Sequence, residues 1–176
     1  MLKKPFIYYA EMDSPIGKLT VGKSEKGICF VEFGSFEETK SLIEKWLQSK
    51  LMNVKLEEEP EQLREAAGQI NEYFSGKRRD FDLPLDLRGT QFQNLVWNQV
   101  KTIPYGETRS YKHIAMEIGA PKAVRAIGGA NNQNPVPLII PCHRVIGSNG
   151  SMVGYGGGLD KKVQLLTLEG AIEKIS

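Results

Sequence analysis

The sequence predicts an α/β protein of the α+β type, made of two parts that meet near Arg88. Three observations predict this class: short β-rich runs fill the first 35 residues, helical periodicity follows, and two short helices flank Gly119-Ala120. The length of 176 residues and the content of 40% hydrophobic and 25% charged residues suit a globular protein of two small domains. We expect a small antiparallel sheet with helices in residues 1–88 and a mainly helical domain in residues 89–176.

The first part begins with three predicted strands, "FIYYAEMD", "GKLTVGKS" and "GICFVEFG". A helix should follow over residues 35–50, because Ser35 is a favourable N-cap and apolar residues recur at helical spacing. A second helix is expected from Glu61 to Phe74, ended by Ser75-Gly76. Residues 76–89 have no clear period and contain Pro84, which predicts a connection between two domains.

The sequence of the second part predicts four helices. The first starts after Thr90 and stops before Pro104, and the last covers residues 159–171. Between them, residues 110–120 and 121–134 form two short helices, the second with Pro121 at its first position. This spacing is typical of a helix-turn-helix whose second helix reads DNA, although a plain helical corner gives the same pattern. Nine basic and five acidic residues from Gly89 onward, a net charge of +4, are compatible with a polyanionic partner.

The sequence argues against several other kinds of site. The two cysteines and two histidines include no paired zinc spacing, so we expect no metal; Cys29 should be a buried hydrophobe and His113 a surface residue. The glycine run at 154–158 lacks the Lys-Ser/Thr of a phosphate loop, so no nucleotide cofactor is expected. No apolar run reaches membrane length, and the two cysteines form no disulfide framework, which favours a cytoplasmic protein without a membrane partner.

The stretch "LIIPCHRVIG", residues 138–147, places Cys142 next to His143. A thiolate is a strong nucleophile, and a nearby histidine can take the thiol proton. Neighbouring side chains on a strand point to opposite faces, but Pro141 favours an irregular loop in which a water could bridge the two groups. A carboxylate should then orient the histidine, and the residues alone do not identify it.

Five sequence blocks together resemble one family. "RGTQFQNLVW", "IPYGETRSY", "PKAVRAIGGANNQNP", "PCHRVIG" and "GYGGGL…LLTLEG", within residues 89–170, are similar in order and spacing to the O6-alkylguanine-DNA alkyltransferases, or methylated-DNA–protein-cysteine methyltransferases. Residues 1–88 resemble the family's ribonuclease-H-like N-terminal domain in length and pattern. The resemblance implies direct, irreversible, single-turnover repair in which Cys142 takes a methyl or alkyl group from guanine O6, and from thymine O4. The nucleotide is flipped out of duplex DNA from the minor groove.

The resemblance also implies roles for individual residues. Cys142 matches the alkyl acceptor, His143 the water-mediated base and Glu169 the carboxylate that orients it. Asn134 matches the asparagine that ties the recognition helix to the active-site loop, and Tyr111 the tyrosine that helps rotate the nucleotide and donates a hydrogen bond to the base. The implied DNA contacts are Tyr111, Lys122, Arg125, Ala126, Gly128 and Gly129, with Arg125 filling the gap left by the flipped base. The implied guanine pocket consists of Asn131, Pro137, Val145, Tyr155, Gly156, Gly157 and Lys162, with Lys162 assisting electrostatically.

Some features depart from the family pattern or leave alternatives open. Gly156 offers only its backbone where some relatives carry a side chain, and Asn131 stands at a position that is apolar in some relatives. The cysteine and histidine residues that bind zinc in some N-terminal domains are missing. The small residues Ala126, Gly128 and Gly129 would also suit tight helix packing. Rival functions are a damage-recognition protein without repair activity, which lacks the acceptor cysteine, a helix-turn-helix regulator and a cysteine hydrolase. We expect a monomer without cofactors, associated with the nucleoid if the host is a prokaryote. The sequence leaves open whether monomers bind DNA cooperatively.

Overall fold

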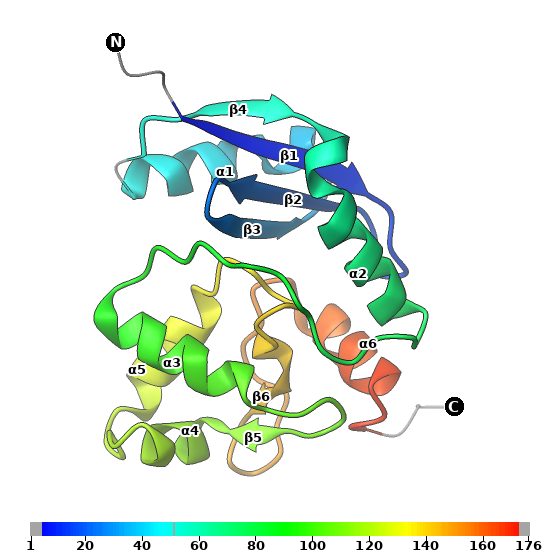
Figure 1. Cartoon of the computed structure of the whole chain (residues 1–176). Coiled ribbons are helices and arrows are strands. Elements are labelled where there is room, and N and C mark those ends of the chain that lie inside the picture. Colours follow the sequence, from blue (N-terminus) through cyan, green and yellow to red (C-terminus); the bar gives the residue numbers. More distant parts are fainter. Residues whose placement is uncertain (1–4, 51, 173–176) are drawn as a thin grey trace. The chain divides into compact units, whose positions relative to one another are not determined.

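The computed structural model describes residues 5–50 and 52–172, which divide after Arg88 into two compact units (Figure 1). The first contains a four-stranded sheet with helices, and the second is mostly helical. The α+β class predicted from the sequence is confirmed. Within the described residues, no helix has the length and apolar character needed to span a membrane.

The sheet of the first unit has the strand order β3-β2-β1-β4. Strands β1 (Phe6–Met12), β2 (Leu19–Ser24) and β3 (Gly27–Phe33) form the expected antiparallel meander. The prediction of an antiparallel sheet needs one correction, because β4 (Lys55–Glu58) pairs in parallel with β1. The helical connection from β3 to β4 brings the chain back in the same direction, as parallel strands require.

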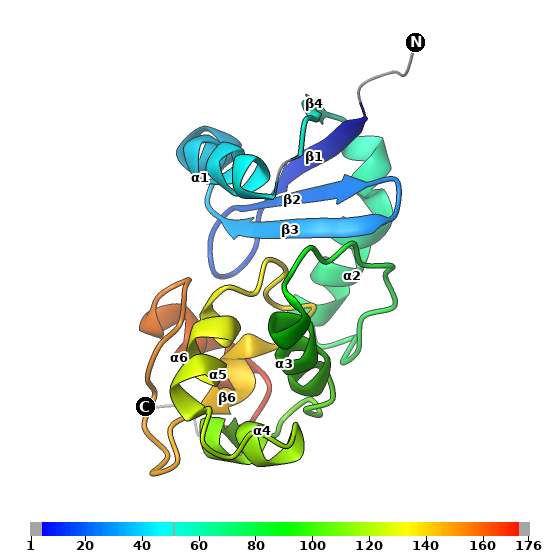
Figure 2. The ribbon, with the colours of Figure 1, turned by 90° about the vertical axis from the view of Figure 1, so that its left-hand side faces the viewer.

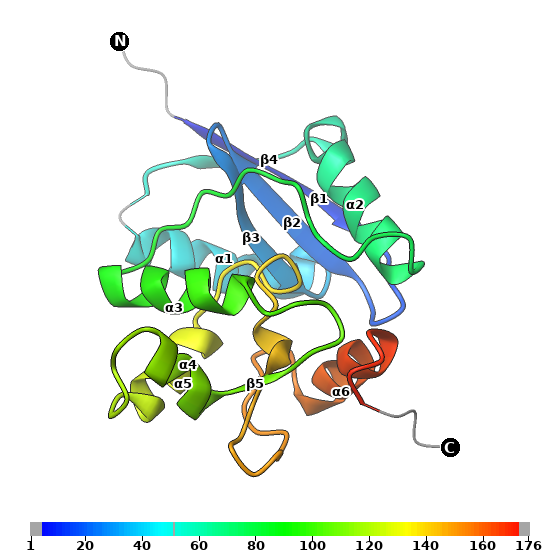
Figure 3. The same ribbon diagram turned by 60° about the horizontal axis from the view of Figure 1, so that its bottom comes forward.

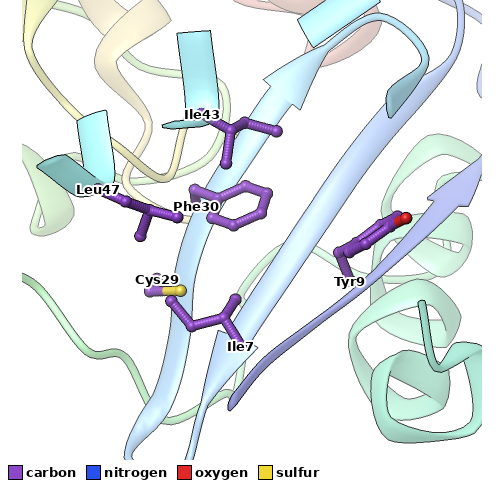
Figure 4. Close-up of a cluster of buried hydrophobic side chains, with 6 residues drawn as sticks. All are labelled: Ile7, Tyr9, Cys29, Phe30, Ile43 and Leu47. Atoms are coloured by element: carbon purple, nitrogen blue, oxygen red, sulfur yellow. The ribbon is translucent and has the colours of Figure 1, made fainter. Parts of the chain in front are cut away.

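Two helices cover opposite faces of this sheet, α1 (Phe36–Ser49) and α2 (Arg64–Phe74), as Figures 1 and 2 show. Helix α1 begins as predicted, at a capping box in which Ser35 and Glu38 bond each other's backbone. A short 3₁₀ helix (Pro60–Leu63) precedes α2. Beneath α1 lies a core cluster that includes Cys29, which is fully buried as expected (Figure 4). The cluster consists of Ile7, Tyr9, Cys29, Phe30, Ile43 and Leu47.

The stretch predicted as a connection is part of the first unit. Leu85 forms an isolated parallel bridge with Ile28 at the free edge of β3, and the Ile28 N–H donates to the Pro84 carbonyl at 2.8 Å. Beside it, the Ser24 hydroxyl donates to the Asp86 carboxylate at 2.5 Å. These contacts protect the sheet edge, which an extended irregular segment can do without hydrophobic periodicity.

The second unit contains α3 (Gln91–Lys101), α4 (Tyr111–Glu117), α5 (Val124–Asn132) and α6 (Leu159–Leu168). Thr90 and Ser110 cap α3 and α4 as predicted. The prediction for α5 was wrong at its start: the helix begins at Val124, and Pro121 lies in the turn before it. Figure 3 shows α4 and α5 together below α3, and the indole of Trp97 on α3 donates to the Ala130 carbonyl on α5 at 2.8 Å.

A buried, irregular segment at 135–141 follows α5 and leads into a 3₁₀ turn at Cys142–Arg144. Strand β6 (Val145–Ile146) continues from this turn and pairs in parallel with β5 (Arg109–Ser110). Within the buried segment Leu138 has φ of +75°, a left-handed conformation that costs a non-glycine residue about 1–2 kcal/mol. The surrounding structure therefore holds this approach to Cys142 in one conformation.

Candidate active site

Cys142 stands at the start of the 3₁₀ turn, with only 6% of its surface exposed. Its N–H donates to the Ile140 carbonyl at 2.8 Å, which closes the chain tightly around Pro141. The turn removes the strand-like alternation that would place Cys142 and His143 on opposite faces. Both side chains are buried in the second unit.

His143 is fully buried and joined to Glu169, the residue that caps the C-terminus of α6. Its Nε2 lies 2.7 Å from Glu169 Oε2. The structure thus pairs these two residues, 26 positions apart, as the resemblance implied. Arg144 completes the cluster, because its Nε and a terminal nitrogen donate to the same carboxylate at 2.8 and 2.9 Å.

The protonation of this cluster follows from its contacts. Burial would raise the pKa of Glu169, but hydrogen bonds from His143 and Arg144 bring the pKa down to about 2, so the carboxylate is ionised at neutral pH. Burial lowers the pKa of His143, although Glu169 opposes this shift. The net lowering favours the neutral ring. A neutral ring facing a carboxylate through Nε2 carries its proton on Nε2. The other nitrogen, Nδ1, is then a bare acceptor, and it has no hydrogen-bond partner in the described part of the chain.

The thiol of Cys142 is a neutral group at rest. Burial raises the pKa of Cys142 to about 11, although hydrogen bonding from Asn134 and Tyr155 and the charge of Lys162 lower it. The groups that lower the pKa of Cys142 can also stabilise a thiolate once it forms. A buried thiol of this kind needs a base to become a nucleophile.

Lys162 on α6 is fully buried and hydrogen-bonded to backbone carbonyls on two segments. Its ammonium donates to Val145 at 2.6 Å and to Val153 at 3.0 Å. Burial lowers the pKa of Lys162 to about 8, and the nearby Cys142 opposes this shift. Lys162 therefore connects Val145, directly after the turn that contains Cys142, with Val153 beside the glycine run. Its charge also lowers the pKa of the Cys142 thiol.

Tyr111, at the start of α4, contacts the same glycine-rich segment. Its hydroxyl donates to the Val153 carbonyl at 3.1 Å and lies 3.4 Å from the Gly154 carbonyl. Burial raises the pKa of Tyr111, so the hydroxyl keeps its proton at neutral pH and remains a donor. In this structure that donor is directed to backbone carbonyls.

Two asparagines connect α5 to the segment before Cys142. Asn134 donates to the Ile140 carbonyl at 2.8 Å and accepts from the Val136 N–H at 3.0 Å. Asn131 is 2% exposed and donates to the carbonyl of Cys142 itself at 3.2 Å. The side chain of Asn134 thus ties both ends of the buried segment, and Asn131 attaches the nucleophile to the helix.

The outer face of α5 carries the residues expected to meet DNA. Arg125, Ala126 and Gly129 are exposed at helical spacing, with Lys122 exposed in the preceding turn. A Cβ atom built on Gly129 would meet nothing within 4 Å, and one on Gly128 would meet only Tyr111 at 3.9 Å. Helix packing among the described residues therefore does not require a glycine at either position.

The remaining pocket candidates are placed unevenly. Pro137 and Val145 are buried and Tyr155 is half-buried, whereas Gly156 is exposed and Gly157 half-buried.

Two features were missed from the sequence: Arg144 as a partner of Glu169, and Lys162 as a backbone anchor. The position of Arg144 directly after the Cys-His pair was the available signal, because a buried histidine–carboxylate pair needs a counter-charge.

Comparison with known proteins identifies the family of the chain. Residues 7–87 match the ribonuclease-like domain of 6-O-methylguanine DNA methyltransferase, and residues 91–171 match its DNA-binding domain. The chain is 46% identical over 165 residues to the methylated-DNA–protein-cysteine methyltransferase of Methanosarcina acetivorans, covering 94% of this chain and 99% of the relative. It is 46% identical over 164 residues to the enzyme of that name from Mycobacterium tuberculosis, covering 93% and 92%.

Solved structures show the same similarity. The crystal structure of Mycobacterium tuberculosis OGT in complex with DNA superposes with a TM-score of 0.79 at 42% identity, covering 93% of each chain. The O6-methylguanine-DNA methyltransferase of Pyrococcus kodakaraensis, at 22% identity and a TM-score of 0.68, shares the fold. The chain belongs to the 6-O-methylguanine DNA methyltransferase family.

Proposed function

We propose that this protein repairs DNA by transferring the alkyl group of O6-alkylguanine to Cys142. The observation that carries the proposal is a buried thiol next to a neutral histidine, whose Nε2 is held by Glu169 and whose Nδ1 is bare. This arrangement supplies a nucleophile and a base within one turn of the chain. Family membership supplies the substrate, since curated relatives over almost the whole chain are methylated-DNA–protein-cysteine methyltransferases.

The chemistry is a displacement at a saturated carbon. His143 takes the Cys142 proton at Nδ1, directly or through one water, and Glu169 stabilises the imidazolium that results. The thiolate then forms an S–C bond as the bond from carbon to O6 breaks, and the electron pair leaves with the guanine. The guanine recovers a proton, with Tyr111 as a donor at its edge, and is restored as the normal base. The product on the protein is a thioether, so each molecule reacts once.

The duplex must release its damaged nucleotide before sulfur can reach it, at a cost of a few kcal/mol. The exposed face of α5 fits this task, because Ala126, Gly128 and Gly129 allow close approach to the minor-groove walls. Arg125, on the same face, fills the space left by the flipped base. Lys122 lies one turn earlier, where it can contact a phosphate.

The proposal extends to the two domains, the guanine pocket and the compartment. We place the catalytic and DNA-binding chemistry in residues 89–176 and a ribonuclease-H-like supporting domain in residues 1–88. Asn131, Pro137, Val145, Tyr155 and the backbone of Gly156 and Gly157 line the guanine pocket, which also accepts O4-alkylthymine. The protein acts as a monomer in the cytoplasm, where reducing conditions preserve the free thiol of Cys142.

One experiment tests the proposal. The protein is incubated with a duplex that contains a single O6-methylguanine, and both products are analysed by mass spectrometry. We expect one methyl group on the peptide that contains Cys142 and unmodified guanine in the DNA. An unmodified Cys142 after complete mixing would refute the transfer, and repeated turnover would indicate a hydrolase.

A further inference from the structure

Arg144 binds the carboxylate of Glu169, which in turn contacts His143, yet the proposed mechanism gives Arg144 no task. We infer that Arg144 is a positioning residue, which keeps Glu169 ionised and thereby holds His143 in the tautomer that can accept the Cys142 proton. The inference rests on the proposed function, because it concerns the base of that reaction. It adds a determinant of the histidine's protonation that lies outside the Cys-His-Glu set.

The contact between Arg144 and Glu169 is bidentate. The guanidinium Nε donates to Oε1 at 2.8 Å and a terminal nitrogen donates to Oε2 at 2.9 Å. The Glu169 side chain has no exposed surface, and that of Arg144 is only 6% exposed. Two parallel hydrogen bonds of this kind fix the plane of the carboxylate as well as its charge.

The guanidinium is itself held from other directions. Its second terminal nitrogen donates to the Ile103 carbonyl at 2.7 Å, in the segment that follows α3. The Tyr105 ring lies beside it, with 5.7 Å between the guanidinium carbon and the ring centroid. Arg144 therefore presents its two donors to Glu169 in a preset orientation, before any substrate binds.

The tautomer of His143 follows from the charge of Glu169. Oε2 accepts from Arg144 and also lies 2.7 Å from His143 Nε2. An ionised carboxylate can only accept, so Nε2 must donate and Nδ1 is left without a proton. A protonated Glu169 could instead donate to Nε2, which would move the ring proton to Nδ1. In that tautomer His143 could not accept the proton of Cys142.

Removal of Arg144 would favour this inactive arrangement. A buried carboxyl without a counter-charge binds a proton readily, with pKa values of about 8–9 in documented cases. Among the described residues, the charged groups that act on His143 are Glu169 and Lys162 from α6 and Arg144 from its own turn, with the thiol of Cys142 directly before it in the chain. Lys162 directs its ammonium to the carbonyls of Val145, Val153 and Gly154, so it does not replace Arg144 at Glu169.

The test measures single-turnover methyl transfer from an O6-methylguanine duplex to the full-length protein between pH 6 and pH 9. The variants are Arg144→Met, which removes the charge, and Arg144→Lys, which keeps a positive charge without the two parallel donors of the guanidinium. Arg78→Met is the matched control, since Arg78 pairs with Glu72 in the first unit, at 3.5 Å. Circular dichroism verifies folding of each variant. Nitrogen-15 NMR of the histidine rings reports which nitrogen of His143 carries the proton.

We expect the native protein to carry the His143 proton on Nε2 throughout this range. The rate ratio of native protein to Arg144→Met should be large at pH 6 and fall by about tenfold or more toward pH 9, as Glu169 ionises in the variant. Arg144→Lys should lie between the two, and Arg78→Met should match the native protein. A rate ratio independent of pH, or a native His143 protonated on Nδ1, would overturn the inference. If Arg144→Met does not fold, the same comparison of rates and of the His143 tautomer between the native protein and Arg144→Lys tests the inference, and transfer by the native protein tests the proposed function separately.

Discussion

The glycine at position 129 offers a test in which folding and DNA binding should change in opposite directions. Gly129 lies inside α5 with open space around its Cβ position, so an alanine there meets no steric obstacle. Glycine in a helix interior is less favourable than alanine by about 0.8–1.0 kcal/mol. Gly129→Ala should therefore raise the free energy of unfolding by roughly 1 kcal/mol.

The same methyl group should weaken binding to DNA. It projects from the exposed face that carries Arg125 and Ala126, into the space that a minor-groove wall would occupy. If the helix must retreat from the groove, we expect a loss of about tenfold in affinity, or about 1.4 kcal/mol. Anisotropy titrations with an O6-methylguanine duplex at one salt concentration measure this affinity. Both proteins carry Cys142→Ala, which prevents the reaction.

Gly68→Ala provides the matched control for this experiment. Gly68 lies inside α2 in the first unit, and its Cβ position is equally open. The substitution should add a similar increment of stability and leave DNA affinity unchanged. If Gly129→Ala bound DNA as tightly as the native protein, close approach of α5 to the groove would be wrong. If it lowered the stability of the fold, the open space around Gly129 would be wrong.

Three further predictions concern the site itself. Cys142→Ala should abolish alkyl transfer while keeping the Kd for damaged duplex within about twofold, as titrations would show; loss of binding would mean that the thiol supports the fold. Arg125→Ala should slow repair of duplex DNA by tenfold or more, about 1.4 kcal/mol, while reaction with the free base O6-methylguanine, which needs no flipping, stays unchanged; equal slowing of both would contradict a role in flipping. Because the folded pKa of Glu169 is about 2, below the ordinary 4.5, its contribution to stability is present above pH 4.5 and is lost as the pH falls toward 2. Denaturant titrations at each pH should therefore show a steeper acid loss in the native protein than in Glu169→Gln, and parallel curves would count against the ion pair.

The helices of this protein could be predicted largely because local chemistry determines where they begin. Ser35 and Thr90 each start a capping box with a residue three positions later, and both helices begin as expected. Strand β4 had no such signal, since three of its four side chains are exposed at the sheet edge. Pro121 fits a first helical position, yet the turn between α4 and α5 extends through Ala123, which determines where α5 can start.

The site was less accessible from sequence, because its partners are far apart in the chain. Cys142 and His143 are visible as neighbours, but Glu169 was identified only through the resemblance to a family. The ion pair of Arg144 with Glu169 and the anchoring of Val145 and Val153 by Lys162 depend on how α6 packs beside the 3₁₀ turn. Spacing along the chain carries no information about such packing, whereas burial of a charged residue becomes evident once the fold is known.

The state of the Cys142 thiol at rest suits a nucleophile that can be used only once. Burial raises the pKa of Cys142 to about 11, so the thiol is protonated at pH 7, whereas a few per cent of an ordinary exposed cysteine is ionised there. Burial thus protects the sulfur from dissolved electrophiles that would consume the protein without repairing DNA. In the proposed mechanism the thiolate forms when His143 takes the proton, and Asn134, Lys162 and Tyr155, which lower the pKa of Cys142, would stabilise the anion. In this mechanism the thiol becomes reactive only when a base lies beside it, and its unreactive resting state would favour reaction with damaged DNA over reaction with dissolved electrophiles.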